Sequence, residues 1–110
     1  MATPEPSSAN AFIVLYRWRL HEGSEGRFVQ AWSRVTDLLR ERGSLGSRLH
    51  RGSDGIWYGY AQWPGAQARQ DAFTRGPVDA RALDQMRAAI SETLPEITLD
   101  AVSDYLIPLG

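Results

Sequence analysis

Two residue types are missing from this sequence of 110 residues, cysteine and lysine. Without cysteine there can be no disulfide, thiolate metal site or cysteine nucleophile. Because small secreted domains often depend on disulfides, a cysteine-free chain of this size favours a cytoplasmic protein. The 12 basic residues, all arginines, are balanced by 13 acidic ones, and the formal net charge is −1. We therefore expect no nucleic-acid partner, which would need a clustered positive surface.

Long apolar runs are also missing. No stretch of the sequence approaches the roughly 20 residues of a membrane-spanning helix, so we expect no membrane partner. Residues 1–10 (MATPEPSSAN) have neither the apolar core nor the basic start of a signal peptide. We predict that they form a disordered tail and that residues 11–110 form one domain.

The rest of the sequence alternates between strand-like and helix-like patterns. Residues 11–20 are rich in β-branched and aromatic side chains, which favour strands. Apolar residues then recur at helical spacing. The expected elements are a strand over 11–20, a helix over 24–42, strands over 44–51 and 56–63, a helix split into 65–74 and 79–93, and a strand over 96–107. This βαββαβ order predicts an α+β, ferredoxin-like fold: a four-stranded antiparallel sheet with helices on one face.

The segment Gly52-Ser53-Asp54-Gly55 has the composition of a hairpin loop. A four-residue loop pairs Arg51 with Ile56 and His50 with Trp57. The face that we assign to the space beneath the helices then carries Ser44, Gly46, Arg48, His50, Trp57, Gly59, Ala61 and Trp63. The opposite face carries Leu45, Ser47, Leu49, Tyr58, Tyr60 and Gln62.

The second of these faces is apolar and aromatic, and the helices cannot cover it. Soluble monomers rarely expose a patch of this kind. The simplest cover is the same face of a second copy, related by a two-fold axis. We therefore predict a homodimer.

The segment Asp54–Trp63 (DGIWYGYAQW), followed by a short helix entered through Pro64, resembles the antibiotic-biosynthesis-monooxygenase family. Members of that family are dimeric α+β barrels, and the resemblance extends over residues 12–107. Its quinone-forming members oxygenate aromatic phenols without metal or flavin, because the substrate anion gives electrons directly to oxygen. The resemblance therefore implies an aromatic or polyketide-like small-molecule substrate and no cofactor.

His50 and Trp63 match positions that line the pocket of those members. Two positions depart from their pattern: Gly59 stands where they place an asparagine, and Arg69 where they place a tyrosine. The haem-degrading branch is a poor match, because its strand asparagine corresponds to Tyr16 and its helix tryptophan to about Ala72, and its histidine has no counterpart here.

His50 is the candidate catalytic base, because an unperturbed imidazole titrates near neutral pH. A structural histidine at the end of a strand is the competing interpretation. The only other histidine, His21, is 29 positions away, and without paired acids nearby the two do not form a metal-site pattern. We therefore predict no metal.

Five further residues are candidates for substrate binding. Trp57 and Trp63 are suited to stack on a flat aromatic ligand, and Tyr16 to line the same cavity, although all three also suit a core. The guanidinium groups of Arg48 and Arg69 are suited to bind a phenolate or carboxylate, although solvent-facing arginines are common.

Three functions remain open from the sequence. The first is a cofactor-independent monooxygenase acting on an aromatic molecule. The second is a non-catalytic protein that binds a small molecule or a partner. The third is a cyclase or isomerase that uses acid–base chemistry on the same fold.

Overall fold

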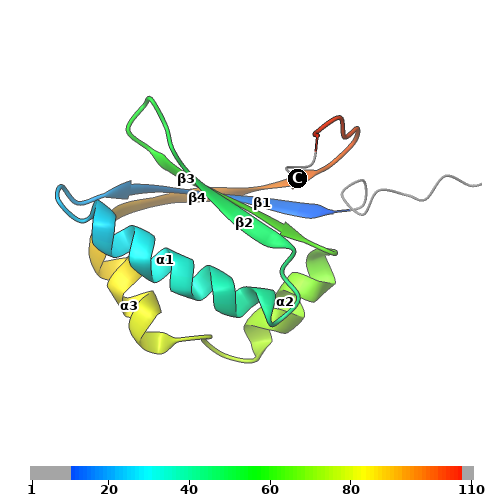
Figure 1. Ribbon diagram of the computed structural model, residues 1–110, viewed down its shortest axis with the longest axis horizontal. Helices are drawn as coiled ribbons and strands as arrows, with labels where there is room; N and C mark the ends of the chain where they lie inside the picture. Colours follow the sequence, from blue (N-terminus) through cyan, green and yellow to red (C-terminus); the bar gives the residue numbers. More distant parts are fainter. Residues whose placement is uncertain (1–10, 108–110) are drawn as a thin grey trace, which may run out of the picture.

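The computed structural model describes residues 11–107, so the predicted tail at residues 1–10 lies outside the described residues. The elements are β1 (Phe12–Leu20), α1 (Glu25–Arg40), β2 (Gly46–Arg51), β3 (Trp57–Trp63), α2 (Ala66–Thr74), α3 (Ala80–Ala89) and β4 (Ile90–Asp100). The strands form one antiparallel sheet in the order β2-β3-β1-β4. The helices cover one side of it, which we call the inner face (Figure 1). The predicted α+β, ferredoxin-like fold is confirmed.

The core lies between the inner face and α1. Val14 and Trp18 project inward from β1 and are buried; Trp18 packs with the buried Phe28 of α1, and Val14 packs with Trp63 in a second cluster. The Phe28 ring makes edge-on contacts with Trp18 and Trp57, at centroid distances of 5.1 and 6.1 Å. Each such side chain contributes roughly 1.5–3 kcal/mol through burial. No helix within residues 11–107 is long and apolar enough to cross a membrane.

The end of the chain differs from the prediction. The helix expected to run to residue 93 ends at Ala89, and β4 begins at once with Ile90. Pro95, expected to stop that helix, lies inside β4, where pairing with β1 is irregular. β4 is an edge strand, so the missing N–H of a proline is tolerated at such a place. The Pro95 carbonyl accepts hydrogen bonds from Arg17 Nη2 (2.8 Å) and Nε (3.2 Å).

The predicted hairpin register is wrong by one residue. The structure pairs Arg51 with Trp57 rather than with Ile56. The N–H of Gly52 donates to the Ile56 carbonyl at 2.7 Å, which leaves a loop of three residues rather than four. Gly55 has φ +82°, and a glycine in the left-handed region is typical of the last position of such a loop.

An odd loop length exchanges the two faces of β2. Ser47 now pairs with Ala61 and Leu49 with Gly59 on the inner face. The other side of the sheet, the outer face, carries Gly46, Arg48 and His50 beside Gln62, Tyr60 and Tyr58. The placement of Arg48 and His50 beneath the helices is therefore wrong. The inward orientation of Trp57, Gly59, Ala61 and Trp63 is confirmed, because these alternate residues of β3 are all buried.

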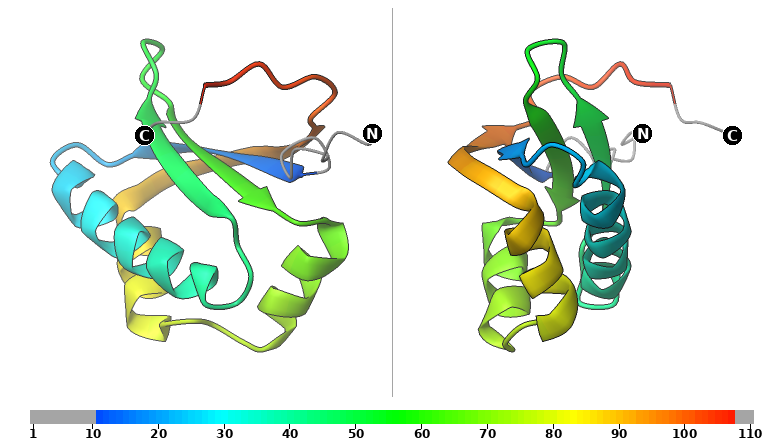
Figure 2. Two further views of the ribbon diagram at one scale, coloured as in Figure 1. Left: turned by 45° about the vertical axis from the view of Figure 1, so that its right-hand side comes forward. Right: turned by 90° about the vertical axis from the view of Figure 1, so that its left-hand side faces the viewer.

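The segment after β4 lies on the outer side of the sheet. Figure 2 shows it opposite the three helices. Tyr105 and Leu106 line a hollow together with Tyr60 and Gln62 of β3. The prediction that the last strand runs to residue 107 is wrong, because β4 ends at Asp100.

Candidate ligand cavity

A cavity of about 180 Å³ lies between the inner face and the helices. Its walls are mainly apolar, and five aromatic side chains line it: Tyr16, Trp18, Trp32, Trp63 and Phe73. The hydroxyl-bearing residues Thr36, Ser44 and Ser47 also line it. Among the described residues on its wall there is no acid, arginine or histidine. An enclosure of this kind suits a small aromatic molecule.

Trp63 carries an unsatisfied donor. It ends β3, is 1% exposed, and lies edge-on to Phe73 at a centroid distance of 5.8 Å. The indole Nε1 is buried and has no hydrogen-bond partner within residues 11–107. Leaving a buried donor unpaired costs about 1–3 kcal/mol. A ligand oxygen that accepts this bond would recover much of that cost.

The Tyr16 hydroxyl accepts a hydrogen bond from an arginine outside the cavity wall. Arg69 of α2 donates from Nη2 to the Tyr16 hydroxyl at 3.0 Å and forms an ion pair with Glu96 of β4 at 3.0 Å. Burial raises the pKa of Tyr16, and Arg69 offsets part of this effect. The phenol therefore keeps its proton at neutral pH. Because its oxygen accepts from Arg69, its own O–H is available as a donor.

Gly59 is required by close packing. A Cβ atom at this position would lie 2.9 Å from Cη2 and 3.0 Å from Cζ3 of Trp18. Small residues on a strand can leave room for a helix or a ligand, but at Gly59 the Trp18 indole takes that space. The Trp18 ring also stacks on Tyr16, with centroids 5.8 Å apart and an interplanar angle of 7°.

The structure brings only part of the predicted site together. Tyr16 and Trp63 line the cavity. Trp57 is buried in the core cluster with Phe28 and is not among the residues that line the cavity. Arg69 contacts the Tyr16 hydroxyl and lines a different hollow, which is formed by Phe12 and residues of α2.

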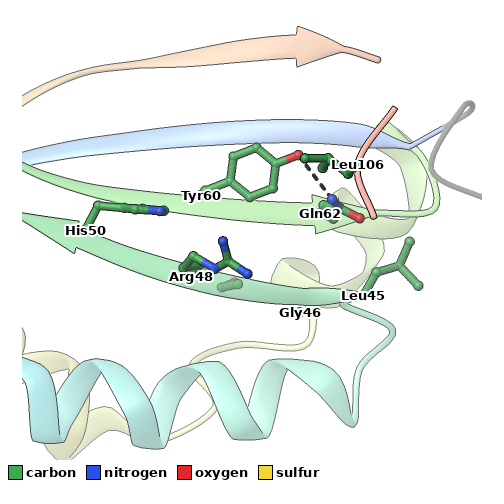
Figure 3. Close-up of a pocket in the computed structure, with 8 residues that line it drawn as sticks. Leu45, Gly46, Arg48, His50, Tyr60, Gln62 and Leu106 are labelled. Carbon is green, nitrogen blue, oxygen red and sulfur yellow. Dashed lines mark hydrogen bonds between the residues drawn. The ribbon is translucent and has the colours of Figure 1, made fainter. Parts of the chain in front are cut away.

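Arg48 and His50 lie on the outer face instead. They line an open hollow of about 470 Å³ together with Tyr60, whose hydroxyl accepts a hydrogen bond from Gln62 Nε2 at 3.1 Å (Figure 3). Leu106, from the segment after β4, forms part of the same wall. The sheet itself therefore separates the predicted base from the predicted stacking wall.

Sequence reasoning missed other lining residues. Trp32 lies in the apolar stripe of α1, so its spacing signalled burial but not contact with a cavity. Ser47 was assigned to the wrong face by the register error. Phe73 follows Pro64 by nine positions, and no pattern marked it as part of the site.

Neither a protein-family model nor a curated protein matches this sequence. Solved structures do match it. SnoaB from Streptomyces nogalater, described as a cofactor-independent oxygenase, has a TM-score of 0.71 at 18% identity, over 88% of this chain and 98% of SnoaB. A candidate antibiotic biosynthesis monooxygenase from Chloroflexus aurantiacus has a TM-score of 0.72 at 11% identity, over 90% of this chain and 100% of that one. Another, from Caulobacter crescentus, has a TM-score of 0.70 at 15% identity, over 87% of this chain and 93% of that one.

These likenesses establish the fold. The chain has the architecture of the antibiotic-biosynthesis-monooxygenase structures, and the resemblance found in the sequence is confirmed at that level. Activity does not follow from a shared fold.

Proposed function

We propose that this protein, which folds as the antibiotic-biosynthesis-monooxygenase structures do, binds a small aromatic molecule carrying a hydroxyl or carbonyl oxygen. The observation that carries this proposal is the unpartnered Nε1 of Trp63, a residue that lines an aromatic cavity; a small shift of the surrounding side chains would bring a ligand oxygen to this buried N–H. The rings of the wall provide stacking surfaces, and the indole N–H selects ligands with an acceptor oxygen.

The size of the cavity sets the scale of the ligand. A dry cavity of about 150 Å³ holds a benzene-sized molecule. A volume of about 180 Å³ therefore suits a body of one or two fused rings. The O–H of Tyr16 is a second donor for the ligand oxygen, and Arg69 strengthens it by withdrawing electron density from the phenol oxygen.

Oxygenation without a cofactor is the second candidate function, and the fold shared with SnoaB favours it. In such a reaction a ring CH2 of the bound phenol becomes a carbonyl. One atom of O2 enters the product, the other leaves as water with the two hydrogens, and the substrate supplies all four electrons. Tyr16 is the one ionisable side chain on the described cavity wall, and its pKa is raised. The substrate must therefore lose its own proton, and Trp63 and Tyr16 would stabilise the resulting phenolate.

The same wall makes a cyclase or isomerase less favourable, because such enzymes need a positioned acid and base near the substrate. His50 cannot be that base from the opposite side of the sheet.

Binding of 2-naphthol, followed by tryptophan fluorescence, tests the main proposal. We expect Trp63→Phe to weaken binding by about three- to tenfold, the value of one hydrogen bond. Trp57→Phe is the matched control, because Trp57 is buried away from the cavity, and should leave affinity unchanged. Equal affinities in all three proteins would refute the role of the indole N–H.

We also propose that a second copy covers the outer face. Ile97 and Leu99 of β4 are 39% and 42% exposed there, and Val102 and Leu106 beyond β4 are almost fully exposed. Burying such a surface in a two-fold interface is favourable at roughly 25 cal/mol per Å² of apolar area.

A further inference from the structure

A shallow groove of about 280 Å³ runs between the solvent side of α1 and the start of β2. Three residues line both this groove and the inner cavity: Trp32, Thr36 and Ser47. These side chains are therefore the partition between the two hollows. Two of them are small, so a modest movement of the Trp32 ring would join the groove to the cavity.

The partition lies at the edge of the sheet. β2 pairs only with β3, so no further strand supports its free side. Gly46, which begins β2 with φ +114°, contributes no side chain to close the gap. Edge strands with few packed side chains are the parts of a fold that open most readily.

The serine and threonine hydroxyls of the cavity gather on this side. Thr36 and Ser47 lie on the partition itself. Ser44 lines the cavity two residues before Gly46, and its hydroxyl accepts the Gly46 N–H at 3.0 Å. An amphiphilic ligand would therefore place its ring among the aromatic side chains and its polar substituent toward the groove.

Charge in the groove indicates the kind of substituent. Asp37 and Arg40 both line it, so it carries one negative and one positive group. Neither an anionic nor a cationic substituent is favoured by such a pair. Arg40 can donate to ether, hydroxyl or amide oxygens of an uncharged chain, and Asp37 can accept from its hydroxyl or amide N–H groups.

We infer that the ligand enters between α1 and β2 and is a one- or two-ring aromatic whose uncharged polar arm remains in this groove. This inference rests on the proposed function. It adds an entry route and a substituent that the inner cavity is too small to hold.

The absence of cysteine from the sequence allows a direct test of the route. Ser47→Cys introduces a single thiol into the partition. Its modification in the folded protein with a bulky methanethiolsulfonate would block passage from the groove to the cavity. We expect association of 2-naphthol to slow by about tenfold or more, as for binding that waits on a conformational change. The matched control is Ser53→Cys, because Ser53 is exposed at the hairpin tip and lines neither the groove nor the cavity; its modification should leave the association rate within about twofold. An unchanged rate after modification at position 47 would overturn the route.

The arm is tested by protection of a second thiol, Ser33→Cys, because Ser33 lines the groove but not the cavity. A 2-naphthol with a short oligoethylene glycol chain should slow modification of Ser33→Cys, whereas plain 2-naphthol should not. Equal modification rates with the two probes would overturn the arm. If wild-type protein binds neither probe, the proposed function fails; if it binds them but modification at position 47 has no effect, only the route fails.

Discussion

Arg69 and Tyr16 are joined by a hydrogen bond of 3.0 Å, although 53 positions separate them in the sequence. The bond links α2 to the central strand of the sheet, and the Arg69 guanidinium also lies over the rings of Tyr16 and Phe73. Arg69 therefore positions a side chain of the cavity wall without forming part of that wall.

Replacing Arg69 should raise the pKa of Tyr16 further. Burial already raises this pKa, and the arginine is the largest opposing influence. In Arg69→Met we expect tyrosinate absorbance from Tyr16 to develop at higher pH than in the wild type, with Tyr16→Phe as the spectrum to subtract. A Tyr16 titration that moves to lower pH would contradict the observed contact.

The raised pKa of Tyr16 also affects stability. A group that holds its proton more tightly when folded stabilises the protein below its unfolded pKa, near 10, and loses that contribution as pH rises through the folded value. The urea midpoint of the wild type should therefore fall more steeply above about pH 10 than that of Tyr16→Phe. Parallel curves would show that Tyr16 has the same pKa in both states.

Asp79 gives the opposite pH dependence. Its carboxylate caps α3 by accepting the Ala82 N–H at 3.0 Å and binds Arg34 at 3.2 Å, and these contacts lower its pKa. The stabilisation is present above the unfolded pKa and disappears as pH falls through the lower folded value. Asp79→Asn should therefore unfold at lower urea than the wild type at neutral pH. We expect the two midpoints to converge as the pH falls below the lowered folded pKa of Asp79; a constant difference would contradict the charge effect.

An asparagine at position 59 should destabilise the fold. Its Cβ would meet the Trp18 ring at 2.9 Å, and overpacking of this kind costs about 1–3 kcal/mol. Because the obstacle is one side chain, Trp18→Leu combined with Gly59→Asn should recover part of the loss. Chemical denaturation of the four proteins of this cycle measures the coupling, and additive effects would exclude the collision as the cause.

His50→Ala should leave naphthol binding unchanged, because the imidazole lies on the outer face. If the protein oxygenates a one- or two-ring phenol that carries a ring CH2, oxygen uptake by this variant should equal that of the wild type. The rate should rise with pH as the substrate ionises. A rate that follows an imidazole pKa and is lost in His50→Ala would restore the histidine as the base.

Sedimentation velocity tests whether a second copy of the chain covers the outer face of the sheet. We expect wild-type protein to sediment as a dimer and Leu99→Asp to raise the dissociation constant by at least about tenfold, because a charge would be buried without a partner. The matched substitution Ser33→Asp lies on the exposed side of α1, on the helix side of the sheet, and should have no effect. A monomeric wild type would refute the dimer.

The strands and helices could be predicted because each has a simple pattern, such as the alternation of Val14, Tyr16 and Trp18. The faces of β2 could not. Side chains alternate along a strand, so one residue in the turn decides the position of every side chain before it. Whether Gly52 belongs to the turn or to the ladder depends on its bond to Ile56, which composition does not reveal.

The candidate site, like the fold, could be predicted only in part from the sequence. Trp63 and Tyr16 were found because large aromatic residues that point inward from a strand lie beneath the helices, although the same reasoning failed for Trp57, which packs in the core. Arg69 and Glu96 were harder, because their meeting depends on how α2 and β4 approach the same end of Tyr16. The boundary between α3 and β4 was misplaced because Pro95 ends a helix and tolerates an edge strand equally well.

The short connection between β2 and β3 controls the chemistry of the cavity from a distance. Adding or deleting a single amino acid there, with β2 shifted by one residue along β3, would turn Arg48 and His50 inward and send Ser47 and Leu49 to the other side. The neutral hydroxyl groups at the edge of the cavity would be replaced by cationic side chains. Length variation at one hairpin tip is thus a simple means by which proteins of this architecture can change what their interiors accept.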